Sequence, residues 1–145
     1  MKRLYYAGPL FTDAERVWNE ANAERLRAAL PQTELLVPQE FCAVHDATEP
    51  GGAVDRAAIF ASCRDHLMSA DAVLAVLDGA DSDSGTAWEM GFAHARGTPI
   101  VGLRTDWRPA EDVVANAMLS RSCHVVCATL DEAVAALRPL AAATA

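Results

Sequence analysis

The sequence lacks long apolar runs and an excess of positive charge. No segment approaches the roughly 18 consecutive apolar residues that a membrane-spanning helix needs, and the amino-terminal MKRLYYAGPL contains only a short apolar stretch. We therefore expect a soluble, cytoplasmic protein without a membrane partner. The formal net charge of −8 repels phosphate backbones and anionic lipid surfaces, so nucleic acid is not an expected partner either.

Cysteine motifs for metal binding or for a disulfide framework are also missing. The four cysteines, Cys42, Cys63, Cys123 and Cys127, form no C-x-x-C pair and have no histidines at metal-ligand spacing. Each of them has apolar or helical neighbours in the sequence. This pattern predicts buried, reduced thiols of a cytosolic protein.

The chain contains neither of the common glycine-rich phosphate-binding motifs, G-x-x-x-x-G-K-[ST] and G-x-G-x-x-G. Its most acidic stretch, DGADSD at residues 78–83, lacks the glycine and terminal glutamate spacing of a calcium-binding EF-hand loop. The sequence thus predicts neither a standard phosphate-binding loop nor a metal site.

What the chain does contain is a regular alternation of apolar runs and helical patterns. With 145 residues and 52% hydrophobic content, residues 1–145 are expected to form a single domain with its own core. Strands are expected over 3–8, 34–38, 72–78, 99–104 and 123–128, helices over 12–30, 53–70, 85–97, 110–120 and 129–140, and the longest loop over 39–52. This order predicts an α/β fold in which helices cover both faces of a five-stranded, mostly parallel sheet.

Local signals fix several helix ends. Thr12 with Glu15, and Thr129 with Glu132, match the T-x-x-E capping box that begins a helix. Gly97 follows a helical pattern at the position of a carboxyl-terminal cap. These signals set the limits of three of the expected helices.

The acidic loop before the helix expected at 85–97 raises the question of function. In parallel sheets ligands bind beyond the carboxyl ends of the strands, which is where Asp78, Asp81 and Asp83 lie. Ordinary turn and helix-cap roles account for these carboxylates, and either Asp83 or Ser84 is expected to cap the helix. Glu89 is different, because it lies inside the helix, and spacing alone leaves a solvent-facing carboxylate and a nucleophile as alternatives.

The resemblance of two stretches to a known family favours the nucleophile over the solvent-facing carboxylate. The stretch ADAVLAVLDGADSDSGTAWEMGFAHARGTPIVGLRTD and the stretch LYYAGPLFTDAERVWNEA resemble the signature regions of the nucleoside 2-deoxyribosyltransferase family. The likeness runs from Tyr5 to about Ser120. It implies a flavodoxin-like, doubly wound sheet and an enzyme without a cofactor that exchanges the bases of 2'-deoxyribonucleosides with free nucleobases.

The resemblance also implies roles for individual residues. Glu89 is expected to attack C1' of deoxyribose, and Tyr5 to orient it, with aromatic packing in the core as the alternative for Tyr5. Asp83 matches the aspartate that binds the sugar hydroxyls. Asn116 and Met118 match a pair that the neighbouring subunit lends to the site, so a homo-oligomer is implied.

The loop after the first strand is expected to lie near the base. It contains Gly8 and Phe11; Phe11 is available for stacking on the base or for a hydrophobic staple on the first helix. Gln39, after the second strand, is placed to bond a base edge. Cys63 departs from the family pattern, since the family commonly has an aspartate there that helps protonate the base, and a thiol is a poor substitute for it.

Two other functions remain as alternatives. An N-glycosidase of nucleosides or nucleoside 5'-monophosphates would use the same glutamate, but such relatives hold phosphate with serine and arginine where this chain has GPLF. Asp83 would repel that phosphate. A non-catalytic nucleoside sensor on the same scaffold would have no evident need for Tyr5, Asp83 and Glu89 together.

Overall fold

The computed structural model describes residues 1–43, 53–106 and 116–142, and a five-stranded parallel sheet forms its centre. The strand order is β2-β1-β3-β4-β5, the doubly wound order of flavodoxin-like proteins. The strands are β1 (Arg3–Ala7), β2 (Glu34–Leu36), β3 (Ala72–Val76), β4 (Ile100–Leu103) and β5 (Val125–Cys127). The predicted fold class is confirmed.

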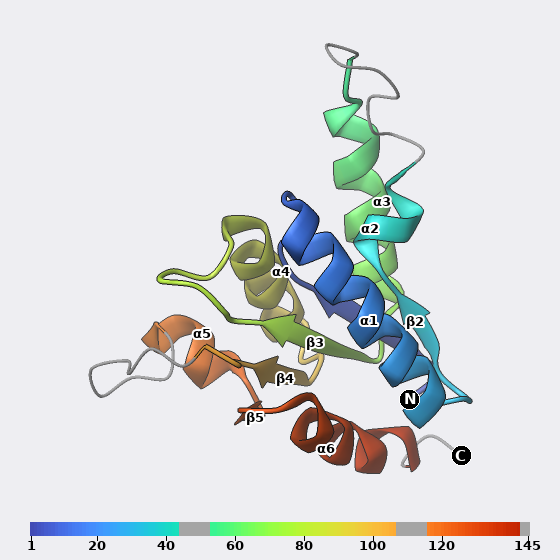
Figure 1. The fold of residues 1–145 in the computed structure, drawn as a ribbon, viewed down its shortest axis with the longest axis vertical. Coiled ribbons are helices and arrows are strands. Elements are labelled where there is room, and N and C mark those ends of the chain that lie inside the picture. The colour runs from blue at the N-terminus through green and yellow to red at the C-terminus, as the bar shows by residue number, and fades with distance from the viewer. Residues whose placement is uncertain (44–52, 107–115, 143–145) are drawn as a thin grey trace.

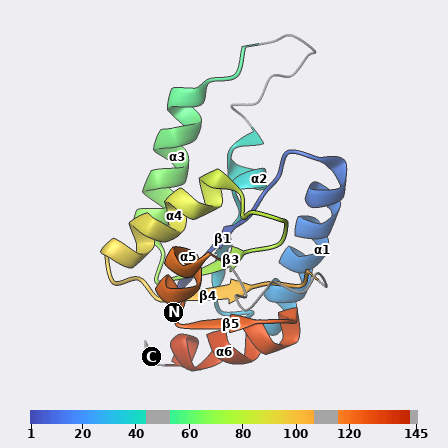
Figure 2. The same ribbon diagram turned by 90° about the vertical axis from the view of Figure 1, so that its left-hand side faces the viewer.

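Helices cover both faces of this sheet, as Figures 1 and 2 show. On one face lie α1 (Asp13–Ala29) and α6 (Leu130–Ala142); on the other lie α3 (Arg56–Ser69), α4 (Ser84–Ala95) and α5 (Ala117–Ser122). The remaining helix, α2 (Pro38–Phe41), follows β2. The strand order reverses direction between β1 and β3, so the crevice at their carboxyl ends is the position where such sheets bind ligands.

Alternation of side chains along β1 links the sheet to both layers. The Tyr6 side chain belongs to the core beneath α1 and α6, whereas the Tyr5 side chain belongs to the core beneath α3 and α4. Every residue of β3 is buried, as expected for a central strand covered on both faces. Two adjacent tyrosines therefore serve opposite sides of the molecule.

The predicted helix signals are found in the structure. Thr12 and Glu15 form the complete capping box at the start of α1, and Gly97 after α4 has a φ of 73°, which favours glycine. At α6, Thr129 accepts from the Glu132 amide at 3.2 Å, while the Glu132 carboxylate accepts from the amide of Ala128 at 2.8 Å. Each helix thus begins or ends where its cap was expected.

Two short elements differ from prediction. The loop expected over 39–52 starts with the four-residue helix α2, because Pro38 at its first turn fixes a helical φ; residues 44–52 lie outside the described residues. The helix expected over 110–120 is described only from Ala117, with Asn116 as its amino-terminal cap, and ends at Ser122. Residues 110–115 of that prediction also lie outside the described part.

The cysteine prediction is partly wrong. None of the four cysteines, all of which lie within the described residues, forms a disulfide, but only Cys42 and Cys127 are buried, while Cys63 and Cys123 are half-buried. No helix within the described residues is long and apolar enough to cross a membrane.

Candidate active site

Tyr5 and Glu89 meet at the centre of the candidate site. Tyr5 is a fully buried residue of β1, and its hydroxyl donates a hydrogen bond of 2.6 Å to Oε1 of Glu89 on α4. The two residues are 84 positions apart in the sequence. Pairing of β1 with β3, and the packing of α4 on both strands, bring them together.

Burial changes the ionisation of this pair. It raises the pKa of Glu89 to about 7; the hydrogen bond from Tyr5 lowers this pKa, and the nearby Asp83 charge raises it. Burial, then the Glu89 charge, raises the pKa of Tyr5 far above its usual value. Tyr5 therefore stays protonated and can donate its hydrogen bond to Glu89 at any physiological pH.

Asp83, one of the two residues expected as the cap, is the amino-terminal cap of α4. Its Oδ2 accepts from the amide of Thr86 at 2.8 Å and from the Thr86 hydroxyl at 3.1 Å. These bonds hold the carboxylate at the start of the helix that carries Glu89. Asp83 thus lies near enough to Glu89, which is six residues further along the chain, for its charge to act on that carboxylate.

A cavity of about 500 Å³ opens in front of these groups. Its lining comes from the loop after β1, from α1, α2 and α3, and from the start of α4. The residues that line it are Gly8, Leu10, Phe11, Arg16, Pro38, Gln39, Cys42, Val54, Ile59, Cys63, Asp83, Gly85, Thr86 and Glu89. The structure thus gathers six residues singled out from the sequence (Gly8, Phe11, Gln39, Cys63, Asp83 and Glu89) around one cavity.

Phe11 and Gln39 line this cavity in different ways. The Phe11 side chain is 75% exposed and the residue expected to face it in a staple is Arg16, so it forms no hydrophobic staple on α1. The Gln39 side chain is buried, and its amide nitrogen donates to Glu20 at 3.0 Å and to the Arg16 carbonyl at 3.2 Å. Its bonds to the protein are therefore already made, whereas the ring of Phe11 is available to a ligand.

A buried asparagine, which the sequence reasoning missed, connects these loops. Asn19 of α1 accepts from the Tyr6 hydroxyl at 3.1 Å and donates to the Pro9 carbonyl at 2.8 Å and to Oε1 of Gln39 at 3.2 Å. It thereby ties the loop after β1 to α2. The available signal was the polar pair Asn19 and Asn22, three residues apart on an otherwise core-facing helix stripe.

Asn116 and Met118 do not reach the cavity of their own chain. Asn116 caps α5 by accepting from the amide of Met118 at 2.8 Å, and the Met118 side chain is 80% exposed. Neither residue is among those that line the cavity. Within one chain the structure does not bring this pair to the site.

Asp78 has the turn role that the sequence indicated. Its carboxylate accepts from the amide and hydroxyl of Thr105 and from the amide of Asp106, at 2.5 to 2.9 Å. Asp78 therefore holds the loop after β4 against the end of β3, rather than facing a ligand.

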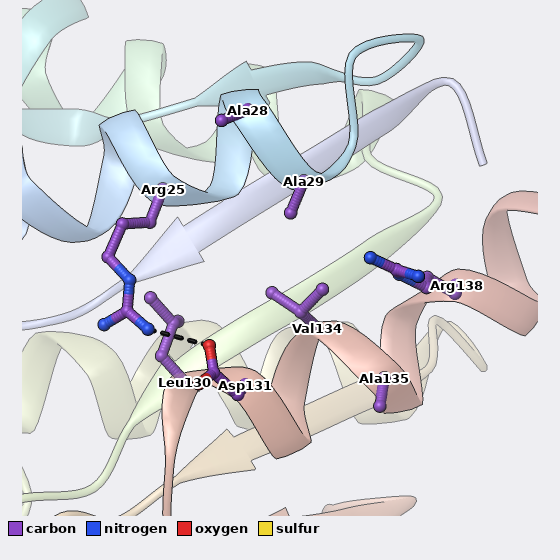
Figure 3. A pocket seen from close by; sticks show the side chains of 8 residues that line it. All are labelled: Arg25, Ala28, Ala29, Leu130, Asp131, Val134, Ala135 and Arg138. Atoms are coloured by element: carbon purple, nitrogen blue, oxygen red, sulfur yellow. Dashed lines mark hydrogen bonds and ion pairs between the residues drawn. The ribbon is translucent and has the colours of Figure 1, made fainter.

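Another cavity lies on the opposite face of the sheet, between α1 and α6. It has a volume of about 610 Å³. Figure 3 shows the Arg25–Asp131 ion pair at its edge, with alanine and valine side chains along its walls. Among the described residues that line it, Asp131 is the only carboxylate and is held in that exposed ion pair, so they include no group comparable to Glu89.

The comparisons with known proteins agree with this geometry. The model of the family described as nucleoside 2-deoxyribosyltransferase matches residues 4–120. The chain belongs to this family. It is therefore related to nucleoside 2-deoxyribosyltransferases. No curated protein matches the chain.

Solved structures similar to this family member cover nearly its whole length. A conserved protein from Enterococcus faecalis V583 is 25% identical with a TM-score of 0.77, covering 96% of this chain and 98% of that one. A 2-desoxiribosyltransferase from Leishmania mexicana is 23% identical with a TM-score of 0.72, covering 94% and 97%. The CMP N-glycosidase BcmB from Clostridium botulinum is 18% identical with a TM-score of 0.57, covering 95% and 98%. At these identities the last two establish the shared fold.

Proposed function

We propose that this chain transfers the 2-deoxyribosyl group between nucleobases through a covalent intermediate on Glu89. The observation that carries the proposal is the Tyr5–Glu89 hydrogen bond at the wall of a cavity whose size suits a nucleoside. Asp83, which lines the same cavity, is proposed to bind the sugar hydroxyls. Membership of the transferase family supports this reading.

In the first step the Glu89 carboxylate attacks C1' of the donor nucleoside. A new bond forms between the carboxylate oxygen and C1', the N-glycosidic bond breaks, and the leaving base takes the electron pair and a proton from solvent. The positive charge that develops at C1' is stabilised by the negative carboxylate. Tyr5, which donates to Oε1, fixes the orientation of this group.

In the second step a ring nitrogen of the acceptor base attacks C1' from the face that the first base left. The C1'–Glu89 bond breaks, the carboxylate is released, and the base loses a proton. Phe11 and the Gly8 loop are proposed to bind the base, next to Gln39. Cys63, at the family's usual aspartate position, supplies no carboxyl proton, so we expect bases that leave without strong acid assistance to be preferred.

The direct test is to incubate 2'-deoxyinosine, thymidine or deoxycytidine with the protein, with and without free adenine, and to separate the products. Formation of deoxyadenosine supports the transferase, whereas base release that is indifferent to adenine would contradict it. Glu89→Ala should abolish turnover by several orders of magnitude with an unchanged circular dichroism spectrum. Asp81→Ala, which removes an exposed carboxylate of the same loop, is the matched control.

One observation supports hydrolysis of nucleoside 5'-monophosphates as a second candidate. Arg16 is the one positively charged side chain among the described residues that line the cavity, and a guanidinium group can bind phosphate. The carboxylates of Asp83 and Glu89, which line the same cavity, repel a dianion, which is why we favour a free 5'-hydroxyl. Comparing thymidine with its 5'-monophosphate as donors, in the wild type and in Arg16→Ala, separates these functions.

We further propose that the protein is a homo-oligomer in which Asn116 and Met118 complete a neighbouring site. Support comes from exposed apolar side chains on the α3–α4–α5 face, where Phe60, Trp88 and Met118 are 52%, 47% and 80% exposed. Mixing inactive Glu89→Ala with Asn116→Ala should restore part of the activity, because mixed oligomers contain one intact site.

A cytoplasmic location and a role in nucleoside salvage are proposed on the basis of membership of the nucleoside 2-deoxyribosyltransferase family.

A further inference from the structure

Two cysteines meet where α2 packs on α3. The Phe41 ring stacks on the His66 ring with centroids 3.9 Å apart and an interplanar angle of 8°. The next residue, Cys42, places its Sγ 3.5 Å from Sγ of Cys63. Positions 63 and 66 lie one turn apart on α3, so these neighbouring contacts fix α2 and its thiol at a defined place on that helix.

This thiol pair belongs to the cavity wall. Both Cys42 and Cys63 line the cavity that contains Glu89, and the Cys63 thiol also interacts with the Tyr5 hydroxyl. Cys63 is half-buried and Cys42 is buried. A small reagent that enters the cavity therefore reaches Cys63 first.

We propose that Cys42 and Cys63 are a modification site, at which a hydroperoxide forms a reversible disulfide that cross-links α2 to α3 and lowers activity. A disulfide needs a sulfur–sulfur distance of about 2.05 Å, roughly 1.5 Å less than the present contact. Rotation of the two side chains and a small shift of the single-turn helix α2 supply this approach.

The chemistry balances with the peroxide as oxidant. The Cys63 thiolate attacks the terminal oxygen, the O–O bond breaks, and the alcohol or water that leaves takes up a proton, which gives a sulfenic acid. The Cys42 thiolate then attacks the sulfenic sulfur, the S–O bond breaks and water leaves. Two thiols and one hydroperoxide thus give one disulfide, one alcohol or water, and one further water.

Burial raises the pKa of the Cys63 thiol, so at neutral pH the first step uses a small thiolate fraction and is slow. The modification therefore responds to sustained exposure to peroxide rather than to brief pulses. Once formed, the cross-link removes the Cys63 S–H group from beside Tyr5. It also moves α2, which forms part of the cavity wall. We expect a several-fold loss of activity that a dithiol reductant restores.

The test treats the whole protein with hydrogen peroxide and maps its peptides by mass spectrometry without reduction. The expected result is a Cys42–Cys63 linked peptide with the loss of two hydrogen atoms, absent in Cys42→Ser and Cys63→Ser. It should persist in the double variant Cys123→Ser with Cys127→Ser, the matched control. Thiols that stay reduced, a Cys63 sulfinic acid without a cross-link, or a cross-link to another cysteine would overturn the proposal.

The effect on activity is a separate measurement, and it rests on the proposed function. Because the cross-link is detected by mass without any substrate, failure of the transferase assignment leaves that result intact. Peroxide-treated wild type should regain its activity with dithiothreitol in parallel with disappearance of the linked peptide. A complete cross-link with unchanged activity would overturn the regulatory half of the proposal.

Discussion

The hydroxyl of Tyr5 lies 2.6 Å from Oε1 of Glu89 and donates a hydrogen bond to it from the centre of the sheet. Two opposing effects meet at this carboxylate: burial raises its pKa to about 7, and the hydrogen bond from Tyr5 lowers it. The protonation state of Glu89 therefore changes within the range of pH that is easily studied. Three predictions depend on this balance.

The pH dependence of kcat/KM should report the ionisation of Glu89. Only the carboxylate form can attack C1', so kcat/KM for a neutral nucleoside should be constant above about pH 8 and fall about tenfold per pH unit below the pKa of about 7. Initial rates with thymidine and adenine between pH 5 and 9 measure this limb. A profile that stays flat down to pH 5 would exclude Glu89 as the group that ionises.

Tyr5→Phe should move this limb to higher pH. Loss of the hydrogen bond that lowers the pKa of Glu89 raises that pKa further, and on the plateau the rate should fall roughly 10- to 100-fold, as for a lost bond to a charged group. Tyr6→Phe is the matched control, because the Tyr6 hydroxyl that it removes donates a hydrogen bond to Asn19 on the opposite face of the sheet. An unchanged midpoint in Tyr5→Phe would contradict the assigned role.

Glu89→Gln should stabilise the fold at alkaline pH. The pKa of Glu89 rises from 4.5 to about 7 on folding, so the protonated side chain is favoured in the folded state. The contribution of this effect to the free energy of unfolding is complete below pH 4.5 and is lost as the pH rises through 7. Relative to the glutamine variant, the wild type should lose about 2–3 kcal/mol of unfolding free energy between pH 5 and pH 8. Urea denaturation at both pH values measures the difference; a gap between the two proteins that does not change with pH would refute this prediction.

Asn19→Leu should weaken both stability and substrate binding. The variant removes the hydrogen bonds that Asn19 makes with the Tyr6 hydroxyl, the Pro9 carbonyl and Oε1 of Gln39, at a cost of about 3 kcal/mol. Because Gln39 lines the cavity, KM should rise as well. Asn22→Leu, which removes only a 3.5 Å bond to Tyr6, should lose less stability and keep its KM; equal effects in the two variants would argue against the positioning role of Asn19.

The fold could be predicted because its signals are local. Apolar runs such as residues 72–78 and the capping box of Thr12 and Glu15 depend on neighbours in the sequence, and the structure confirms them. The helix α2 was missed because four residues are too few to show a helical period. The sequence placed Asn116 inside the helix expected over 110–120, whereas Asn116 is the amino-terminal cap of α5. Asparagine is common at that cap position, and the sequence pattern did not separate the two roles.

The candidate site was only partly predictable. The resemblance singled out Glu89, Tyr5 and Asp83, but the sequence left open whether Glu89 faces water or Tyr5. Asn19 and Cys42 were not singled out, since each acts through a partner about 20 positions away, on another element. The half-buried position of Cys63 depends on how α3 packs, and no pattern along the chain reports that.

By itself the sequence determined the alternation of strands and helices, the caps at their ends and the acidic loop that precedes Glu89, because these follow from the chemistry of adjacent residues. Only the tertiary structure decided that the Tyr5 hydroxyl reaches Glu89, that Asn19 joins two loops and that the Cys42 and Cys63 thiols touch. Such contacts depend on strand order and helix packing. Both are determined by the burial of whole faces of the sheet against the helices, and not by any short stretch of the chain.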